Sequence, residues 1–238
     1  MFIFAENSAM LDKSHKYVSC ETCQVRKDSL FSSFCTEEVH QLDENKVCSF
    51  YRKNQPLFVE GTFSRGVYCI NDGKVKIFTI GESGKEQIIH IAKEGDVVGF
   101  KAMFSDDPYK LSATTLEESN ICFIKKEDFL SHLESNPGLL QTVLKELSKE
   151  LGERAVFIKN MAQKSVRERL ATILLILDGV YKDEMINLSR EDLANFVGTA
   201  TETIIRLLKE FKEEQLIEIH VRKIEILDRK KLLREAGS

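Results

Sequence analysis

The sequence predicts an α+β protein in which an antiparallel β-barrel precedes a long helix and a C-terminal winged helix-turn-helix. Short apolar segments separated by turn residues fill residues 47–125, and many short strands with evenly spaced turns are typical of a small barrel or jelly roll. Apolar residues then recur at helical spacing through residues 136–161. Two short amphipathic patterns joined by a glycine follow at residues 188–209, which is the pattern of a helix-turn-helix.

The N-terminal arm carries the one close cysteine pair of the chain. Cys20 and Cys23 form a C-x-x-C motif, which can place two thiolates on one metal ion or cluster. Cys35 follows further along the chain, whereas Cys69 and Cys122 lie in strand-like apolar runs, where a free cysteine usually behaves as a small buried hydrophobe. A structural disulfide framework is not expected in a reducing compartment.

The barrel is expected to form from hairpins, because turn signals lie at residues 71–73 and 82–84. Its interior is expected either to hold a small ligand or to be filled by side chains. We therefore divide the chain into an arm with the C-x-x-C motif at residues 1–28, a barrel at residues 29–135 as effector or sensor domain, a helix at residues 136–162, and a winged helix-turn-helix at residues 163–238, with the wing at residues 216–227.

The long helix carries apolar residues at alternating spacings of four and three. This is the pattern of a coiled-coil seam rather than of the wider stripe on a core-facing helix, although burial against the barrel is the alternative. Arg154 fills the one polar position of the series, so two copies would bring like charges together. We predict a homodimer whose interface consists of Leu140, Leu144, Leu147, Leu151, Arg154, Ile158 and Met161.

The helix-turn-helix pattern is the strongest functional signal. Ser189 suits the cap at the start of the first helix and Gly198 its end, and Thr199 or Thr201 can cap the second helix. The alternative is an ordinary helical hairpin of a protein core. The outward face of the second helix favours DNA, because its side chains match base edges and phosphates.

The predicted DNA contacts follow from side-chain chemistry. Glu202 can accept a hydrogen bond from cytosine N4, Arg206 can bind guanine O6 and N7 as a fork, and Ile205 can contact a thymine methyl group. Phosphate contacts are predicted for Thr199, Thr201 and Lys209.

Composition excludes several classes of protein. With 42% hydrophobic and 30% charged residues, the chain is expected to be globular. No apolar run approaches the ~20 residues that cross a bilayer and no signal-peptide pattern is present, so we expect a cytoplasmic protein without membrane contact. We find no Ser–His–Asp set, phosphate-binding glycine loop or paired-carboxylate motif and therefore expect no enzyme. The net charge of −4 requires the DNA-contacting charge to be local.

This order of parts resembles the Crp/Fnr family of bacterial regulators from about Cys20 to Leu233. The segments that carry the resemblance are Gly84-Lys-Glu-Gln-Ile, Gly95-Asp-Val-Val-Gly-Phe-Lys-Ala-Met and Thr201-Glu-Thr-Ile-Ile-Arg. The resemblance implies a transcription regulator with a barrel of the cyclic-nucleotide-binding type. It would bind a two-fold symmetric operator in double-stranded DNA as a homodimer and act with RNA polymerase, as activators of the family do.

The Fnr-like branch is the more similar one. Cyclic-AMP receptors carry a glutamate and an arginine for the nucleotide where this chain has Phe100 and Leu111. Lys101 or Lys110 could replace the arginine only as a point charge, without its forked hydrogen bonds. These departures argue against cyclic AMP as the effector. The alternative that stays open is a regulator that binds a cyclic nucleotide or another small ligand without a metal centre.

Fnr-like oxygen sensors hold a [4Fe-4S] cluster with three N-terminal cysteines and one from the barrel. Cys20 and Cys23 match the first two of these positions and Cys122 matches the barrel position, but Ser29 stands at the third. Serine is a hard oxygen ligand and a poor substitute for a thiolate. The ligand set that the resemblance implies is therefore Cys20, Cys23, Cys122 and, as the nearest spare cysteine, Cys35.

Overall fold

The computed structural model describes residues 18–182 and 184–237, so residues 1–17 of the predicted arm lie outside the described residues. An eight-stranded antiparallel barrel forms the N-terminal half, built from two four-stranded sheets of order β1-β8-β3-β6 and β2-β7-β4-β5. The predicted antiparallel barrel is thereby confirmed. Its strands are β1 (Val47–Tyr51), β2 (Pro56–Phe58), β3 (Gly66–Asp72), β4 (Val75–Ile80), β5 (Glu86–Ala92), β6 (Val97–Val98), β7 (Ser112–Thr115) and β8 (Ser119–Lys125).

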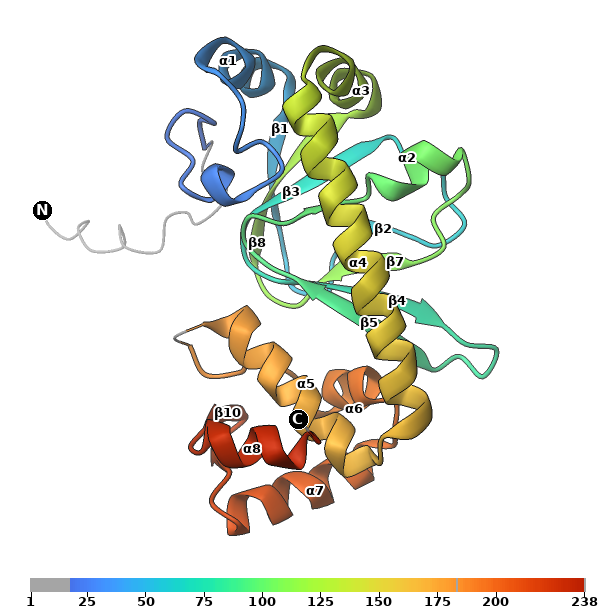
Figure 1. The fold of residues 1–238 in the computed structure, drawn as a ribbon, viewed down its shortest axis with the longest axis vertical. Helices are drawn as coiled ribbons and strands as arrows, with labels where there is room; N and C mark the ends of the chain where they lie inside the picture. The colour runs from blue at the N-terminus through green and yellow to red at the C-terminus, as the bar shows by residue number, and fades with distance from the viewer. Residues whose placement is uncertain (1–17, 183, 238) are drawn as a thin grey trace, which may run out of the picture.

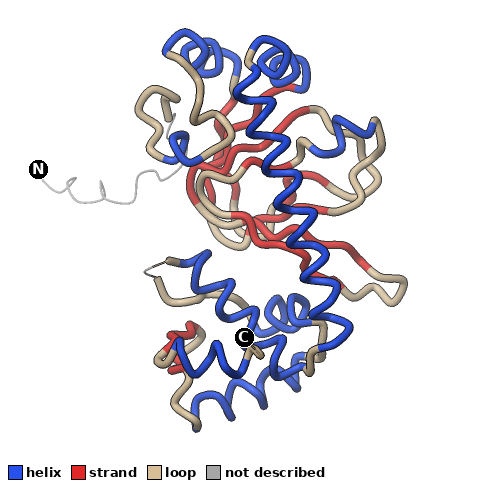
Figure 2. Tube along the Cα trace, viewed as in Figure 1, coloured by secondary structure: helices blue, strands red, loops and turns tan. Residues whose placement is uncertain are grey.

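Four short helices lie around the barrel, and α1 and α3 lie together at one end of it (Figures 1 and 2). They are η1 (Val25–Asp28), α1 (Thr36–Asn45), α2 (Lys101–Ser105) and α3 (Lys126–Ser135). Phe31, Phe34 and Phe129 stack edge to face beneath α1 and α3, and they share a buried cluster with Leu42 and Leu139. This cluster fixes the N-terminal segment against the barrel and the start of the long helix, because aromatic side chains bury the largest areas.

The long helix α4 (Pro137–Gln163) connects the two halves of the molecule (Figure 1). It begins at Asn136, whose side chain accepts a hydrogen bond from the Leu139 amide at 2.8 Å, with proline in the first turn. These are the preferred residues for a helix start. Its 27 residues extend for about 40 Å at 1.5 Å per residue.

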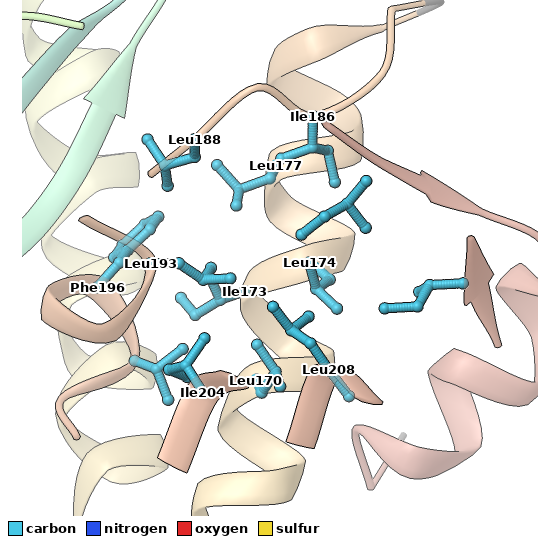
Figure 3. Packing of buried hydrophobic residues seen from close by; sticks show 14 of the residues in the cluster. Leu170, Ile173, Leu174, Leu177, Ile186, Leu188, Leu193, Phe196, Ile204 and Leu208 are labelled. Atoms are coloured by element: carbon cyan, nitrogen blue, oxygen red, sulfur yellow. The ribbon is translucent and has the colours of Figure 1, made fainter. Parts of the chain in front are cut away.

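The C-terminal unit is a winged helix-turn-helix, as the sequence predicts. Its elements are α5 (Val166–Tyr181), α6 (Arg190–Val197), α7 (Thr201–Glu213), the two-stranded wing β9 (Ile217–His220) and β10 (Lys223–Ile226), and α8 (Arg229–Glu235). Leucines of α5 face Leu193, Ile204 and Leu208 of the two DNA-module helices (Figure 3). This common core fixes the angle between α6 and α7.

The two halves share one apolar cluster. Phe78, Ile88 and Ile91 of the barrel belong to the same buried cluster as the core of the C-terminal unit. Around it, the side-chain amide of Gln87 donates to the Asn195 carbonyl at 2.7 Å, so α6 is docked on β5. In the described part of the chain, every helix is too short or too polar to cross a membrane.

Candidate functional site

The turn between α6 and α7 has the backbone that a helix-turn-helix requires. Ser189 caps α6 by accepting from the Asp192 amide at 2.9 Å. Gly198 ends it at φ 74°, in the left-handed region that favours glycine. A side chain at this position would also collide with Met161 at the end of α4. The prediction that a threonine caps α7 is wrong. Ala200 occupies the N-cap position, and no side chain accepts a hydrogen bond from the first turn of the helix.

The recognition helix α7 has one buried and one exposed face. Ile204, Leu207 and Leu208 are at most 4% exposed, as the helical period predicts. On the other face Glu202, Ile205, Arg206 and Lys209 are exposed, and Thr199 and Thr201 at its start are half-buried. Ile205 is apolar and 54% exposed.

The two cationic side chains on the exposed face of α7 form ion pairs at the protein surface. Arg206 pairs with Glu210 at 2.6 Å and Lys209 with Glu213 at 3.8 Å, each one helical turn apart. Such pairs contribute only about 0.3–0.5 kcal/mol. Both cations can therefore leave their partners for DNA at little cost.

The long helix α4 has two apolar rows rather than one. Leu144, Leu151 and Ile158 recur every seven residues and are 55%, 74% and 67% exposed, and Leu140 is 44% exposed beside them. These four predicted seam residues lie on the surface of the single chain and are free to contact a second copy.

Three other predicted seam residues make contacts within their own chain. Leu147 packs against the helix cluster under α1 and α3. Arg154 donates to the Ile89 carbonyl of β5 at 2.7 Å and to Glu150 at 2.8 Å, and Met161 lies against Gly198. The exposed positions one residue further along are small or polar: Gln141, Ser148, Ala155 and Ala162. Leu147, Arg154 and Met161 are half-buried in the single chain, so their part in the seam stays a prediction.

The two positions at which cyclic-AMP receptors carry a glutamate and an arginine for the nucleotide hold apolar side chains here, in a groove that also contains charged ones. A groove of about 1050 Å³ lies between the barrel and α4, and both Phe100 and Leu111 line it. Lys101 is paired with Glu150 at 2.5 Å and Lys110 with Asp107 at 4.0 Å. Lys101 is held by a short ion pair, whereas the surface pair of Lys110 is weak.

His90 also lines this groove. Burial, with nearby Arg154 second, lowers the pKa of His90 to about 4. The imidazole is therefore neutral at physiological pH, and the groove gains no positive charge from it.

The C-x-x-C segment folds back on the barrel. The Cys20 amide donates to Asp43 at 2.6 Å, and Lys46 donates from Nζ to Cys20 Sγ at 3.0 Å. The Cys23 thiol donates to Asn71 Oδ1 of β3 at 3.5 Å. Burial raises the pKa of the Cys20 thiol.

Four cysteines line one cavity beneath this segment: Cys20, Cys23, Cys69 and Cys122. Cys35 is not among them, because it is exposed at the start of α1. Cys122 also forms a disulfide with Cys48, contrary to the expectation of free thiols. Within residues 18–182 and 184–237, three or more candidate ligands are nowhere arranged to hold a metal ion. The implied ligand set with Cys35 is therefore not assembled.

Both halves of the chain match models of known protein families. The family model of the cyclic nucleotide-binding domain matches residues 49–136, and that of the Crp-like helix-turn-helix domain matches residues 168–235. Together with the exposed α7, these matches define a DNA-binding transcription regulator. The structure is similar to that of FixK2 from Bradyrhizobium japonicum, with a TM-score of 0.75 and 21% identity over 81% of this chain and 98% of that one.

Relatives of known sequence give the family. The chain is 30% identical to the Fumarate and nitrate reduction regulatory protein of Vibrio cholerae, over 92% of this chain and 91% of the relative. It is also 30% identical to the Anaerobic regulatory protein of Haemophilus influenzae, over 93% and 89%. The chain belongs to the Crp/Fnr family, in its Fnr-like branch. It is a regulator rather than an enzyme, as the sequence predicts.

Proposed function

We propose that the protein is a homodimer that binds a two-fold symmetric operator and couples this binding to a redox signal sensed at the N-terminal cysteines. In this proposal residues 1–28 and 29–135 form the sensor, residues 136–162 the dimer helix, and residues 163–238 the DNA-binding unit. The observation that carries the proposal is the exposed face of α7, with Glu202, Ile205 and Arg206 pointing away from the core.

The exposed row of α4 supports the dimer. Leu144, Leu151 and Ile158 leave an apolar stripe on the surface of the single chain, and pairing with a second α4 would bury it. Ala155 and Ala162 on the same side would let the two helices approach closely. Helix-turn-helix dimers place their recognition helices one turn of DNA apart, about 34 Å.

Contacts at the end of α4 support a coupling between dimer and DNA. Met161 lies on Gly198, and Arg169 of α5 donates to the carbonyl of Val197 at 2.9 Å. A change in the pairing of two α4 helices would therefore move the turn before α7. Such a displacement would change the spacing of the two recognition helices.

The proposed signal is oxygen or cellular redox state. Relatives named for anaerobic regulation and for fumarate and nitrate reduction suggest it. Cys20, Cys23 and Cys122 line one cavity, and their sulfur atoms would fit the soft donor chemistry of an iron–sulfur cluster once the disulfide of Cys122 is reduced. A bound [4Fe-4S] cluster would supply oxygen sensitivity through its iron and sulfide. The proposed output is transcription activation through contact with RNA polymerase.

A gel-shift experiment tests the DNA-binding part. Arg206→Ala should weaken binding to a duplex with a two-fold TGA/TCA-type site by ~1–3 kcal/mol and relax preference at one base pair. Arg52→Ala is the matched control, because Arg52 is an exposed arginine on the barrel. Equal affinity of the Arg206→Ala and wild-type proteins for the operator would contradict the assignment.

The large groove favours a second candidate function, a regulator controlled by a small ligand without a metal. Its volume of about 1050 Å³ is that of a ligand site, and such sites usually range over ~300–1,000 Å³. Phe100 and Leu111 give it apolar surface, and Lys93, Lys101 and Arg154 give it positive charge, so it suits an effector with both apolar and anionic groups. Metal-free protein whose operator affinity rises with a cell extract of small molecules, but not with reconstitution of iron and sulfide, would favour this candidate.

A further inference from the structure

The arginine on the exposed face of α7 is held by a carboxylate one helical turn further along. Arg206 donates from Nη1 to Glu210 Oε1 at 2.6 Å. A guanidinium group has five N–H donors in a fixed plane, and within the described residues Nε and Nη2 of Arg206 donate to no protein acceptor. The edge formed by these two nitrogens is therefore free for O6 and N7 of a guanine, while Nη1 stays on the carboxylate.

Glu210 is itself fixed from its other side by an arginine of α5. Arg167 donates from Nη1 to Glu210 Oε2 at 3.4 Å, so each oxygen of this carboxylate faces a different guanidinium. The side chains of Arg167 and Glu210 are 29% and 35% exposed, whereas that of Arg206 is 64% exposed. The contacts thus lead from a partly buried arginine at the start of α5 to an exposed one on α7.

Every nitrogen of the Arg167 guanidinium has a partner. Nε donates to Glu235 of α8 at 2.9 Å, and Nη2 donates to Glu214, the residue after α7, at 2.6 Å. Its Cζ lies over the ring of the buried Phe211, 4.6 Å from the centroid. Residues of α7 and α8 therefore fix the orientation of this side chain of α5, and a lysine with its single point charge could not make the same contacts.

The neighbouring ion pair of α7 has no such support. Lys209 and Glu213 have the same spacing of four residues, but they lie 3.8 Å apart and are 77% and 64% exposed. In the described part of the chain Glu213 forms no second ion pair. Exposed pairs at this spacing contribute little on their own. Glu210 differs from Glu213 through its contact with Arg167, not through its place in the helix.

We propose that Glu210 and Arg167 are positioning residues for base recognition: Glu210 orients Arg206 toward guanine, and Arg167 keeps Glu210 in place. The inference rests on the proposed reading of guanine by Arg206. An arginine side chain loses rotamer freedom when it binds a base, and a partner that orients it beforehand lowers this entropic cost. Only the base pair that Arg206 contacts benefits, so the two residues set specificity rather than general affinity for DNA.

The negative charge of Glu210 separates positioning from ordinary attraction to DNA. A carboxylate beside DNA repels the phosphates, so its neutralisation should leave binding to an unrelated duplex equal or make it tighter. Loss of positioning acts in the opposite direction and only at the operator. A side chain that merely stabilises the fold would instead weaken binding to every duplex alike.

The experiment measures the affinity of full-length protein for three duplexes by fluorescence anisotropy. They are the two-fold TGA/TCA-type site, the same site with the G·C pair of one half-site replaced by A·T, and an unrelated sequence. Glu210→Gln should lower the preference for guanine, which is the ratio of the first two affinities, about threefold to tenfold. Its binding to the unrelated duplex should be unchanged or tighter. Glu213→Gln is the matched control and should keep the wild-type ratio.

A second variant tests the support of Glu210. Arg167→Met keeps a long apolar stem beside Phe211 and should lower the preference for guanine at least about twofold. Circular dichroism and thermal unfolding check that each variant folds, and Glu210→Gln decides the role of Glu210 even where Arg167→Met does not fold. A wild-type ratio in folded Arg167→Met would remove Arg167 from the proposal.

A double variant shows whether Glu210 acts through Arg206. In the Arg206→Ala background, Glu210→Gln should leave the remaining preference unchanged, because no guanidinium is left to orient. A further loss of preference in the double variant would mean that Glu210 acts on the base by another route, which contradicts the positioning role.

Failure of this inference and failure of the proposed function give different results. A wild-type preference in Glu210→Gln, together with a lost preference in Arg206→Ala, overturns the positioning role and keeps Arg206 as the base reader. A wild-type preference in Arg206→Ala overturns both. Equal weakening of Glu210→Gln on all three duplexes assigns Glu210 a purely structural role and also overturns the inference.

Discussion

Truncation of Leu151 gives the sharpest measurement of the dimer proposal. Leu151→Ala removes three carbons, roughly 2.4 kcal/mol at ~0.8 kcal/mol per buried carbon. Because Leu151 is 74% exposed in the single chain, pairing can bury at most about three quarters of this, about 1.8 kcal/mol per chain and about 3.5 kcal/mol per symmetric dimer. The dimer dissociation constant should therefore rise by up to a few hundredfold.

Sedimentation across a dilution series measures this constant. Leu147→Ala is the matched control, because Leu147 lies on the same helix but packs inside its own chain. It should lower the free energy of unfolding by roughly 2 kcal/mol or more and leave the dissociation constant unchanged. A Leu151→Ala dimer within about threefold of wild type would refute the assignment of this row to the seam.

Three further predictions concern stability. Asp192→Asn removes the carboxylate that Lys76 binds at 2.9 Å and should cost about 1.5–3 kcal/mol, with faster hydrogen exchange in α6, whereas the exposed neighbour substitution Glu191→Gln should change neither. His90 has a folded pKa of about 4, below its unfolded value, so its contribution to stability is complete above pH ~6.5 and is lost as the pH falls toward 4. Urea unfolding at several pH values should show this loss in wild type and a smaller one in His90→Asn. Gly198→Ala places a side chain at φ 74° and should cost at least ~1–2 kcal/mol, measured by thermal unfolding, and an unchanged midpoint would contradict the strained turn.

The faces of α7 follow from the sequence because this helix has only one apolar side. Ile204, Leu207 and Leu208 recur with the helical period, so burying them leaves Glu202 and Arg206 outside. In α4 the same argument fails. Leu144 and Leu151 can form a seam with either of the two neighbouring rows of α4, because both rows have the same spacing. Only the contact of Arg154 with a barrel carbonyl distinguishes the two rows.

The cysteine site could be predicted only in part. The C-x-x-C spacing identifies Cys20 and Cys23 without any knowledge of the fold. Cys69 and Cys122 are 53 residues apart and become neighbours only through the register of β3 and β8, which single-sequence patterns do not fix. An alternation count along both strands would have placed the two cysteines on the same side of the sheet, but not opposite one another.

The apolar cluster shared by both halves has a consequence for how this regulator can be taken apart. Phe78, Ile88 and Ile91 complete the core of the C-terminal unit, so a cut before α5 would expose apolar surface on both fragments. We expect the excised DNA-binding unit to aggregate, and chimeras with foreign sensor barrels to require these three barrel residues. The two halves should therefore unfold in one transition. A mutation deep in the barrel can then lower the cellular amount of DNA-binding protein without changing how the protein senses its signal.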